Sequence, residues 1–259
     1  MKLSAYFSLK RFYYLLRRDL FSNYRVLLVA MAATAAVLLV ASIIAYLSNG
    51  TENFHLTFYS MILIIGGFII SSTVFSELHN GQRSYVYLTL PGSIFEKYVE
   101  KLLLTSLVYV IGSVIFYFAF SLLASGVNLM VFGRGTALFN PFNIEILENI
   151  GRYLVLQSLF LFGAVYFKKQ AFIKTVSSVF GLIIALSFFG FLMVRLVYWD
   201  YFSGVRDFPS YDFSASFTFN DFVNSWGSFF ENLVIVLFWG ITAPFFWILG
   251  FLRLRETEV

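Results

Sequence analysis

Long runs without a charged side chain are the feature that most constrains the fold of this chain. No Asp, Glu, Lys or Arg occurs between Arg25 and Glu52, and residues 26–47 are almost wholly apolar. A helix needs about 20 apolar residues to cross the hydrocarbon core of a bilayer. Inside lipid, a chain satisfies its backbone polar groups only as a helix or a closed barrel. The run therefore predicts a membrane-spanning helix.

Five further runs of this kind follow, so the expected fold is an all-α integral membrane protein. The six expected transmembrane helices lie at about 26–47, 56–75, 102–125, 146–167, 175–194 and 232–252. Hydrophobic residues make up 59% of the chain, against about 45–50% in soluble domains. Residues 1–259 are thus expected to form a single transmembrane domain.

Several spans carry residues that predict irregular geometry or close packing. Gly66-Gly67, at the centre of the second span, predicts a kink or a tight helix contact. The third span is expected to end near Ser125-Gly126 with an irregular tail. The fourth has to begin near Ile146 to be long enough, which brings Glu148 or Arg152 toward the headgroups. Thr242 and Pro244 are expected to bend the sixth.

The first 25 residues predict an amphipathic helix that lies along the membrane surface. They contain six basic residues and one acid. On a helix, one face carries apolar residues, while Arg11 and Arg18 lie opposite and Lys10 and Arg17 flank. The apolar face consists of Tyr6, Leu9, Tyr13, Leu16 and Leu20. A solvated basic leader that only orients the first span is the alternative interpretation.

The segment 76–101 is a polar interruption between the second and third spans. Pro91-Gly92 closes a turn, and Ser93 followed by Glu96 forms the pattern of a capping box. A helix is therefore expected to begin at Ser93, in water, and to continue without a breaker into the third span. Force on this segment would then move the membrane helix.

The distribution of charge predicts the topology. With the N terminus in the cytoplasm, 14 of the 18 Lys and Arg residues lie on the cytoplasmic side. Both termini and segment 76–101 are then cytoplasmic. The net charge of +4 reflects membrane orientation, so we expect no nucleic-acid partner.

The longest outer segment, 198–230, mixes aromatic and acidic residues and predicts short helices or re-entrant turns at the outer leaflet. The segment is interpreted either as a simple interfacial anchor or as the lining of a substrate exit. The candidate lining residues are Tyr198, Trp199, Phe217 and Trp226.

No motif for nucleotide binding, zinc binding or nucleophilic catalysis occurs in the sequence, and it contains no cysteine. The two histidines, His55 and His79, are expected on opposite sides of the membrane, so no metal site and no catalytic residue is expected. Gln157 is the most polar residue deep in a span. We expect it to bond to a neighbouring helix, with contact to a substrate as the weaker alternative.

The arrangement as a whole resembles the permease subunits of type-2 ABC transporters, the group with the type V exporter fold. The most specific parts are residues 80–97 and the ending 251–259, which resemble small bacterial permeases, particularly those of Bacteroidetes-like genomes. The resemblance covers essentially the whole chain.

The resemblance implies a transport subunit and not an enzyme. It implies an exporter in the bacterial inner membrane, with two ATPase subunits that carry ATP and Mg²⁺ and with a second permease copy, identical or a paralogue. Residues 77–90 would dock on the ATPase and residues from Ser93 onward would transmit. The coupling residues so implied are Glu77, Arg83, Ser84, Tyr85, Tyr87, Ser93 and Glu96.

Two other classes remain open from the residues alone: a membrane-embedded enzyme, such as a lipid-modifying protein, and an assembly factor without a transport role. An enzyme would require His, Asp or Glu clustered at one depth, and the sequence predicts no such cluster. An assembly factor would not require a helix start joined to a charged cytoplasmic segment.

Overall fold

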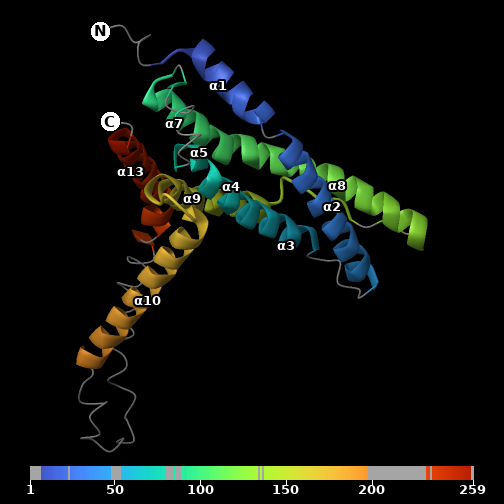
Figure 1. Ribbon diagram of the computed structural model, residues 1–259. Helices are drawn as coiled ribbons and strands as arrows, with labels where there is room; N and C mark the ends of the chain where they lie inside the picture. The colour runs from blue at the N-terminus through green and yellow to red at the C-terminus, as the bar shows by residue number, and fades with distance from the viewer. Residues whose placement is uncertain are drawn as a thin grey trace, which may run out of the picture.

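The computed structural model describes residues 7–22, 24–47, 54–79, 85, 89–90, 92–133, 135, 137–197, 232–233 and 235–257. Every regular element within these ranges is helical (Figure 1). The elements, with η denoting a π-helix, are α1 (Leu9–Ser22), α2 (Tyr24–Leu47), α3 (Phe54–Met61), η2 (Ile62–Gly66), α4 (Gly67–Thr73), α5 (Ser76–His79), α7 (Ile94–Leu103), η3 (Leu104–Val108), α8 (Tyr109–Phe132), α9 (Ile144–Tyr166), α10 (Ala171–Val197), η5 (Leu237–Ile241) and α13 (Thr242–Thr257).

Five of these stretches are long and apolar enough to cross a membrane. They are Tyr24–Leu47, Phe54–Leu78, Ile94–Phe132, Ala171–Met193 and Leu237–Thr257. The chain is therefore a helical protein of the multi-pass membrane type. The expected layout of six spans stays a prediction, because the helix at the position of the fourth span, α9, is not among the five.

α9 is less apolar than these five stretches and lies largely against other helices of the chain. Ten of its 23 residues are buried, and it packs against α4, α10 and α13. Asn149 near its start bonds to Ser60 of α3, and Leu161 and Val165 near its end pack with Phe75. α9 thus runs beside the helix Phe54–Leu78 for most of its length.

The third apolar stretch is longer than expected. Helix continues without a break from Ile94 to Phe132, and the irregular tail expected after Ser125 is absent. α8 ends at Gly133, whose left-handed backbone (φ 70°) lets its N–H bond to the carbonyl of Leu129. Gly126 leaves the helix intact because a single glycine costs only about 1 kcal/mol in a helix interior.

The last helix is irregular one turn before the expected bend. The π segment η5 ends at Ile241, and Thr242 donates its hydroxyl to the carbonyl of Leu237 at 3.0 Å. α13 then runs through Pro244 to Thr257. Its far half packs on α7, where the Tyr98 hydroxyl bonds to the carbonyl of Trp247 at 2.7 Å.

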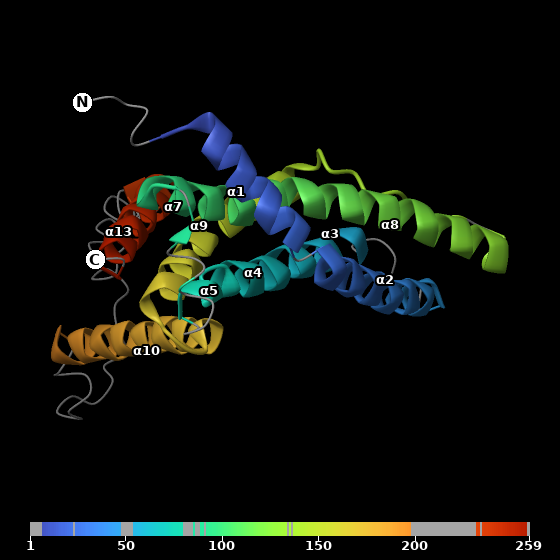
Figure 2. The same ribbon diagram turned by 45° about the horizontal axis from the view of Figure 1, so that its top comes forward.

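α1 lies across α7 at one end of the molecule (Figure 2). Leu9 and Tyr13 of its predicted membrane face are 75% and 58% exposed. On the other side, Leu15 is buried and lies against Gly92. α13 also ends near α7, so the described beginning and end of the chain lie on the same side of the molecule.

Candidate functional site

The helix start at Ser93 has the geometry that the sequence predicts. Ser93 has an extended backbone, and its hydroxyl accepts the N–H of Glu96 at 3.1 Å. The Glu96 carboxylate in turn accepts the N–H of Ser93 at 2.8 Å. Both halves of the capping box are present, and the helix continues from here into α8.

This helix start is covered by the chain itself, which differs from the expectation that it lies in water. Glu96 has no exposed surface. Its Oε1 accepts the N–H of Ser8 at 2.5 Å and a guanidinium N–H of Arg11 at 3.0 Å. Because α1 brings these donors, the carboxylate can be withdrawn from water without losing its hydrogen bonds.

The next charged residues of α7 are buried as well. Lys97, Glu100 and Lys101 are 4%, 2% and 6% exposed. The ammonium group of Lys101 bonds to Asp19 of α1 and lies 3.9 Å from a Glu100 oxygen. The Lys101–Asp19 pair, with Glu100 beside it, is therefore internal to the α1–α7 contact. Glu96 cannot contact a partner protein directly in this conformation.

A further ion pair joins α1 to the other end of the polar segment. Arg18 donates to Glu77 of α5 at 3.2 Å. Arg11 and Arg18 are seven residues apart, or about 10 Å along a helix. α1 therefore forms a strut whose two arginines hold Glu77, just before residues 80–91, and Glu96, just after them.

The remaining predicted coupling residues are only partly described. Tyr85 is 74% exposed, so its ring is free of the helical core. Arg83, Ser84 and Tyr87 lie outside the described residues, as do all four outer aromatic candidates: Tyr198, Trp199, Phe217 and Trp226. The structure gives no geometry for these seven residues.

Gln157 bonds to a neighbouring helix, as the sequence favours. It is fully buried on α9, and its amide donates to the hydroxyl of Thr105 in η3 at 2.7 Å. One turn earlier, the Tyr153 hydroxyl donates to the carbonyl of Thr105 at 2.5 Å. Gln157 is thus part of a polar contact inside the helix bundle.

Sequence reasoning did not identify Asp19, Thr105 and Tyr153. Asp19 carried a usable signal, because it is the single acid in the basic first 25 residues. Thr105 and Tyr153 carried none, since hydroxyl residues are common in spans and their partners are set by packing.

The described residues contain no group of three or more His, Cys, Asp or Glu side chains that could hold a metal ion. His55 makes structural contacts instead. Its Nε2 lies 2.7 Å from the carbonyl of Ala137, and its Nδ1 lies 3.3 Å from the Tyr117 hydroxyl. A carbonyl only accepts, so Nε2 carries the hydrogen and Nδ1 accepts from Tyr117.

Comparison of the chain with models of protein families, with curated proteins and with solved structures finds no match.

Proposed function

We propose that this chain is the membrane-spanning subunit of an ATP-driven transporter, with ATP hydrolysed on separate ATPase subunits. One observation carries the proposal. Ion pairs from α1 hold both ends of the polar segment, at Glu77 and at Glu96, and the second end continues without a break into the 39-residue helix Ile94–Phe132. A load on residues 80–91 would reach α1 and α7 together. Such an element suits a protein that receives force from a partner.

The position of the chain ends supports an even number of crossings. Tyr98 of α7 packs against Phe251 of α13, and Arg11 of α1 holds Glu96 of the same α7. If α1 is cytoplasmic, as its basic residues favour, the end of α13 is cytoplasmic too. α9, which runs beside a spanning helix, then supplies the sixth crossing in the bacterial inner membrane.

A second copy of the permease, or a paralogue, completes the proposed transporter. Every described side chain from Phe180 to Leu196 of α10 is exposed. The small residues between Ala30 and Ala36 on α2 are also mostly exposed and permit close helix approach. These two helices are the faces on which the copies would meet. Export is the proposed direction, with the substrate path between the copies.

The proposal is tested by purifying the full chain from its native membranes in mild detergent, together with its bound proteins. We expect an ATPase subunit to co-purify and the complex to hydrolyse ATP. Tyr85→Ala should reduce the recovery of the ATPase, because aromatic side chains dominate interface energies. Tyr13→Ala is the matched control, since Tyr13 is 58% exposed on the face of α1 assigned to lipid.

Two outcomes contradict the proposal. One is a purified chain that carries no ATPase and shows no nucleotide-dependent change. The other is an equal loss of ATPase in both tyrosine variants, which would mean that residue 85 has no special part in docking.

Topology is tested separately with introduced cysteines, because the chain has none of its own. Phe142→Cys, at a side chain 82% exposed, should react with an impermeant thiol reagent in intact cells. Tyr85→Cys should react only after the membrane is opened. The reverse pattern would overturn the orientation.

A further inference from the structure

Two π segments lie in neighbouring helices: η2 contacts α8, and η3 contacts α4. η2 interrupts the helix Phe54–Leu78, and η3 interrupts the helix Ile94–Phe132. A π turn holds one residue more than an α turn, is rare, and occurs mostly as a single turn at a functional position. Two of them in neighbouring helices require a physical explanation, because each disturbs the backbone pairing of an apolar helix.

Tyrosine hydroxyls bind a main-chain carbonyl within each of these π segments. Tyr109, the first residue after η3, donates to the carbonyl of Ile62 in η2 at 2.7 Å. Tyr153 of α9 donates to the carbonyl of Thr105 in η3 at 2.5 Å. The two rings are themselves in contact, with centroids 5.6 Å apart. We call Tyr109 and Tyr153 the tyrosine latch.

The glycine pair of the second span makes room for the latch. A Cβ atom on Gly66 would lie 2.6 Å from the Tyr109 hydroxyl, and one on Gly67 would lie 2.2 Å from the Tyr153 ring. Both distances are shorter than any van der Waals contact. The glycines therefore serve close contact between helices, and each latch residue has its own glycine.

η3, where Tyr153 of the latch binds the carbonyl of Thr105, is connected to the α1 strut through Lys101. Gln157 donates to the Thr105 hydroxyl, which donates to the carbonyl of Lys101 at 2.9 Å. The Lys101 ammonium bonds to Asp19 of α1. A displacement of α1 and α7 is therefore transmitted to η3, where Tyr153 of α9 is hydrogen-bonded to the main-chain carbonyl of Thr105.

We propose that η3 is a hinge that the tyrosine latch holds closed. The helix Ile94–Phe132 then acts as two rods, α7 and α8, that change their relative direction at residues 104–108. Motion of α7 passes through Thr105 to α9, and the outer part of α8 stays in place. The hinge follows from contacts within the chain and does not depend on which partner binds residues 80–91.

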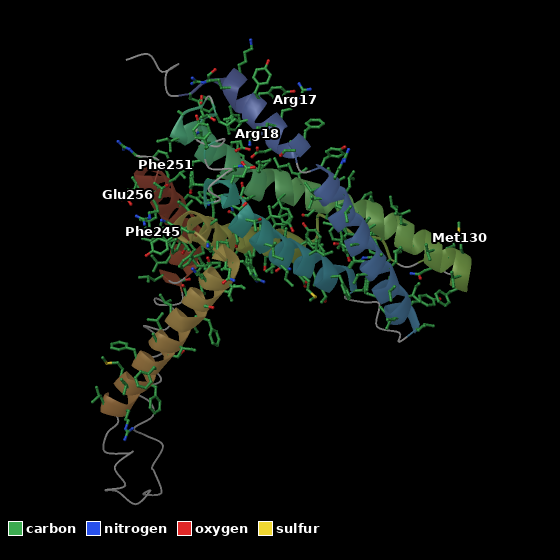
Figure 3. The ribbon with its side chains drawn as sticks, in the orientation of Figure 1. Arg17, Arg18, Met130, Phe245, Phe251 and Glu256 are labelled. Carbon is green, nitrogen blue, oxygen red and sulfur yellow. The ribbon has the colours of Figure 1, made fainter. Side chains whose placement is uncertain are left out.

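The test measures distances within one helix by pulsed electron spin resonance on the full chain in lipid nanodiscs. One pair of spin labels, at Phe95→Cys and Ile115→Cys, flanks η3, and both native side chains are exposed. A second pair, at Ile115→Cys and Met130→Cys, lies wholly in α8 and is the internal control (Figure 3 labels Met130 near the far end of α8). Background labelling is absent because the sequence contains no cysteine.

Tyr153→Phe should widen the distance distribution of the pair that flanks η3 and leave the pair within α8 unchanged. Loss of one hydrogen bond shifts the ratio of bent to straight helix roughly 2- to 12-fold. Tyr117→Phe is the matched variant, since Tyr117 is equally buried but its hydroxyl faces His55. Widening in Tyr153→Phe alone supports the hinge; no widening, or equal widening in both variants, overturns it.

A measurement on the unaltered chain decides the matter if Tyr153→Phe does not fold. Hydrogen exchange of the amides at 104–109 should be faster than that of the amides at 111–116, although both stretches lie in the same apolar helix. Equal protection of the two stretches would mean that η3 is as rigid as α8, and the hinge would be rejected.

Discussion

Replacing Glu96 by Gln removes one charge from the α1–α7 contact and changes almost nothing in shape. The carboxylate accepts three hydrogen bonds: at Oε1 from Ser8 and Arg11, and at Oε2 from Ser93. Glutamine has one oxygen and one NH₂ group. If its oxygen keeps Ser8 and Arg11, its NH₂ faces the N–H of Ser93, and that bond becomes a contact between two donors.

The magnitude follows from these three bonds. A hydrogen bond to a charged group contributes about 1.5–3 kcal/mol, and one of the three is lost while α1 is attached. When α1 opens, the glutamine oxygen can turn back to the N–H of Ser93, so this loss counts against the attachment of α1. The ion pair adds little by itself, roughly 0–1 kcal/mol, because the Arg11 side chain is 38% exposed. We expect Glu96→Gln to weaken the attachment of α1 by about 2–3 kcal/mol, which is roughly a 30- to 150-fold increase in local opening.

Hydrogen exchange of the full chain in lipid nanodiscs measures this opening directly. Amides within α1 should exchange faster by that factor in Glu96→Gln, and those of α8 should not change. The control is Glu148→Gln, whose pair with Arg152 is 3.1 Å long but 52% exposed on both sides, so its loss should have little effect. Exchange in α1 within threefold of the unaltered chain would refute the assignment of Glu96 as an anchor of α1.

Three further predictions test the bundle. Gly67→Ala should strongly lower the free energy of unfolding, because its Cβ would lie 2.2 Å from the Tyr153 ring. Gly126→Ala should raise the free energy of unfolding by about 1 kcal/mol, because no atom lies within 4 Å of its Cβ. Equal effects of the two substitutions would contradict the packing. Lys101→Met should destabilise by about 3–5 kcal/mol by leaving Asp19 without its buried partner, and adding Asp19→Leu should restore part of the loss in the same unfolding assay. Gln157→Leu should change stability by less than about 1 kcal/mol, because it removes both the bond to Thr105 and a buried amide oxygen without a hydrogen-bond partner among the described residues. A large loss of transport at unchanged stability would instead assign Gln157 to the substrate path.

Local signals in the sequence predicted local structure well. The cap at Ser93 depends on residues three positions apart, and a span depends on a run of apolar residues, so both can be read without knowledge of the fold. The amphipathic N-terminal helix is also present, with its apolar face exposed.

Contacts between segments far apart in the chain could not be predicted from the sequence. The burial of Glu96 and Lys101 depends on α1 folding back over 80 residues of chain, and charge alone predicted the opposite. The π segments lie where Tyr109 and Tyr153 pack against Gly66 and Gly67. Only the glycine pair drew attention in the sequence, and its partners could not be known.

The low apolarity of α9 has a consequence for how the protein is made. A helix enters the bilayer from the translocon according to its own hydropathy, and charges such as Glu145, Glu148 and Arg152 oppose entry. The helices against which α9 packs include α4, synthesised earlier than α9, and α13, synthesised later. If α9 crosses the membrane, it is expected to enter with the help of helices already there and to gain its full cover only once α13 has been made. Biogenesis of this protein would then include a late assembly step inside the membrane, around a helix of low apolarity.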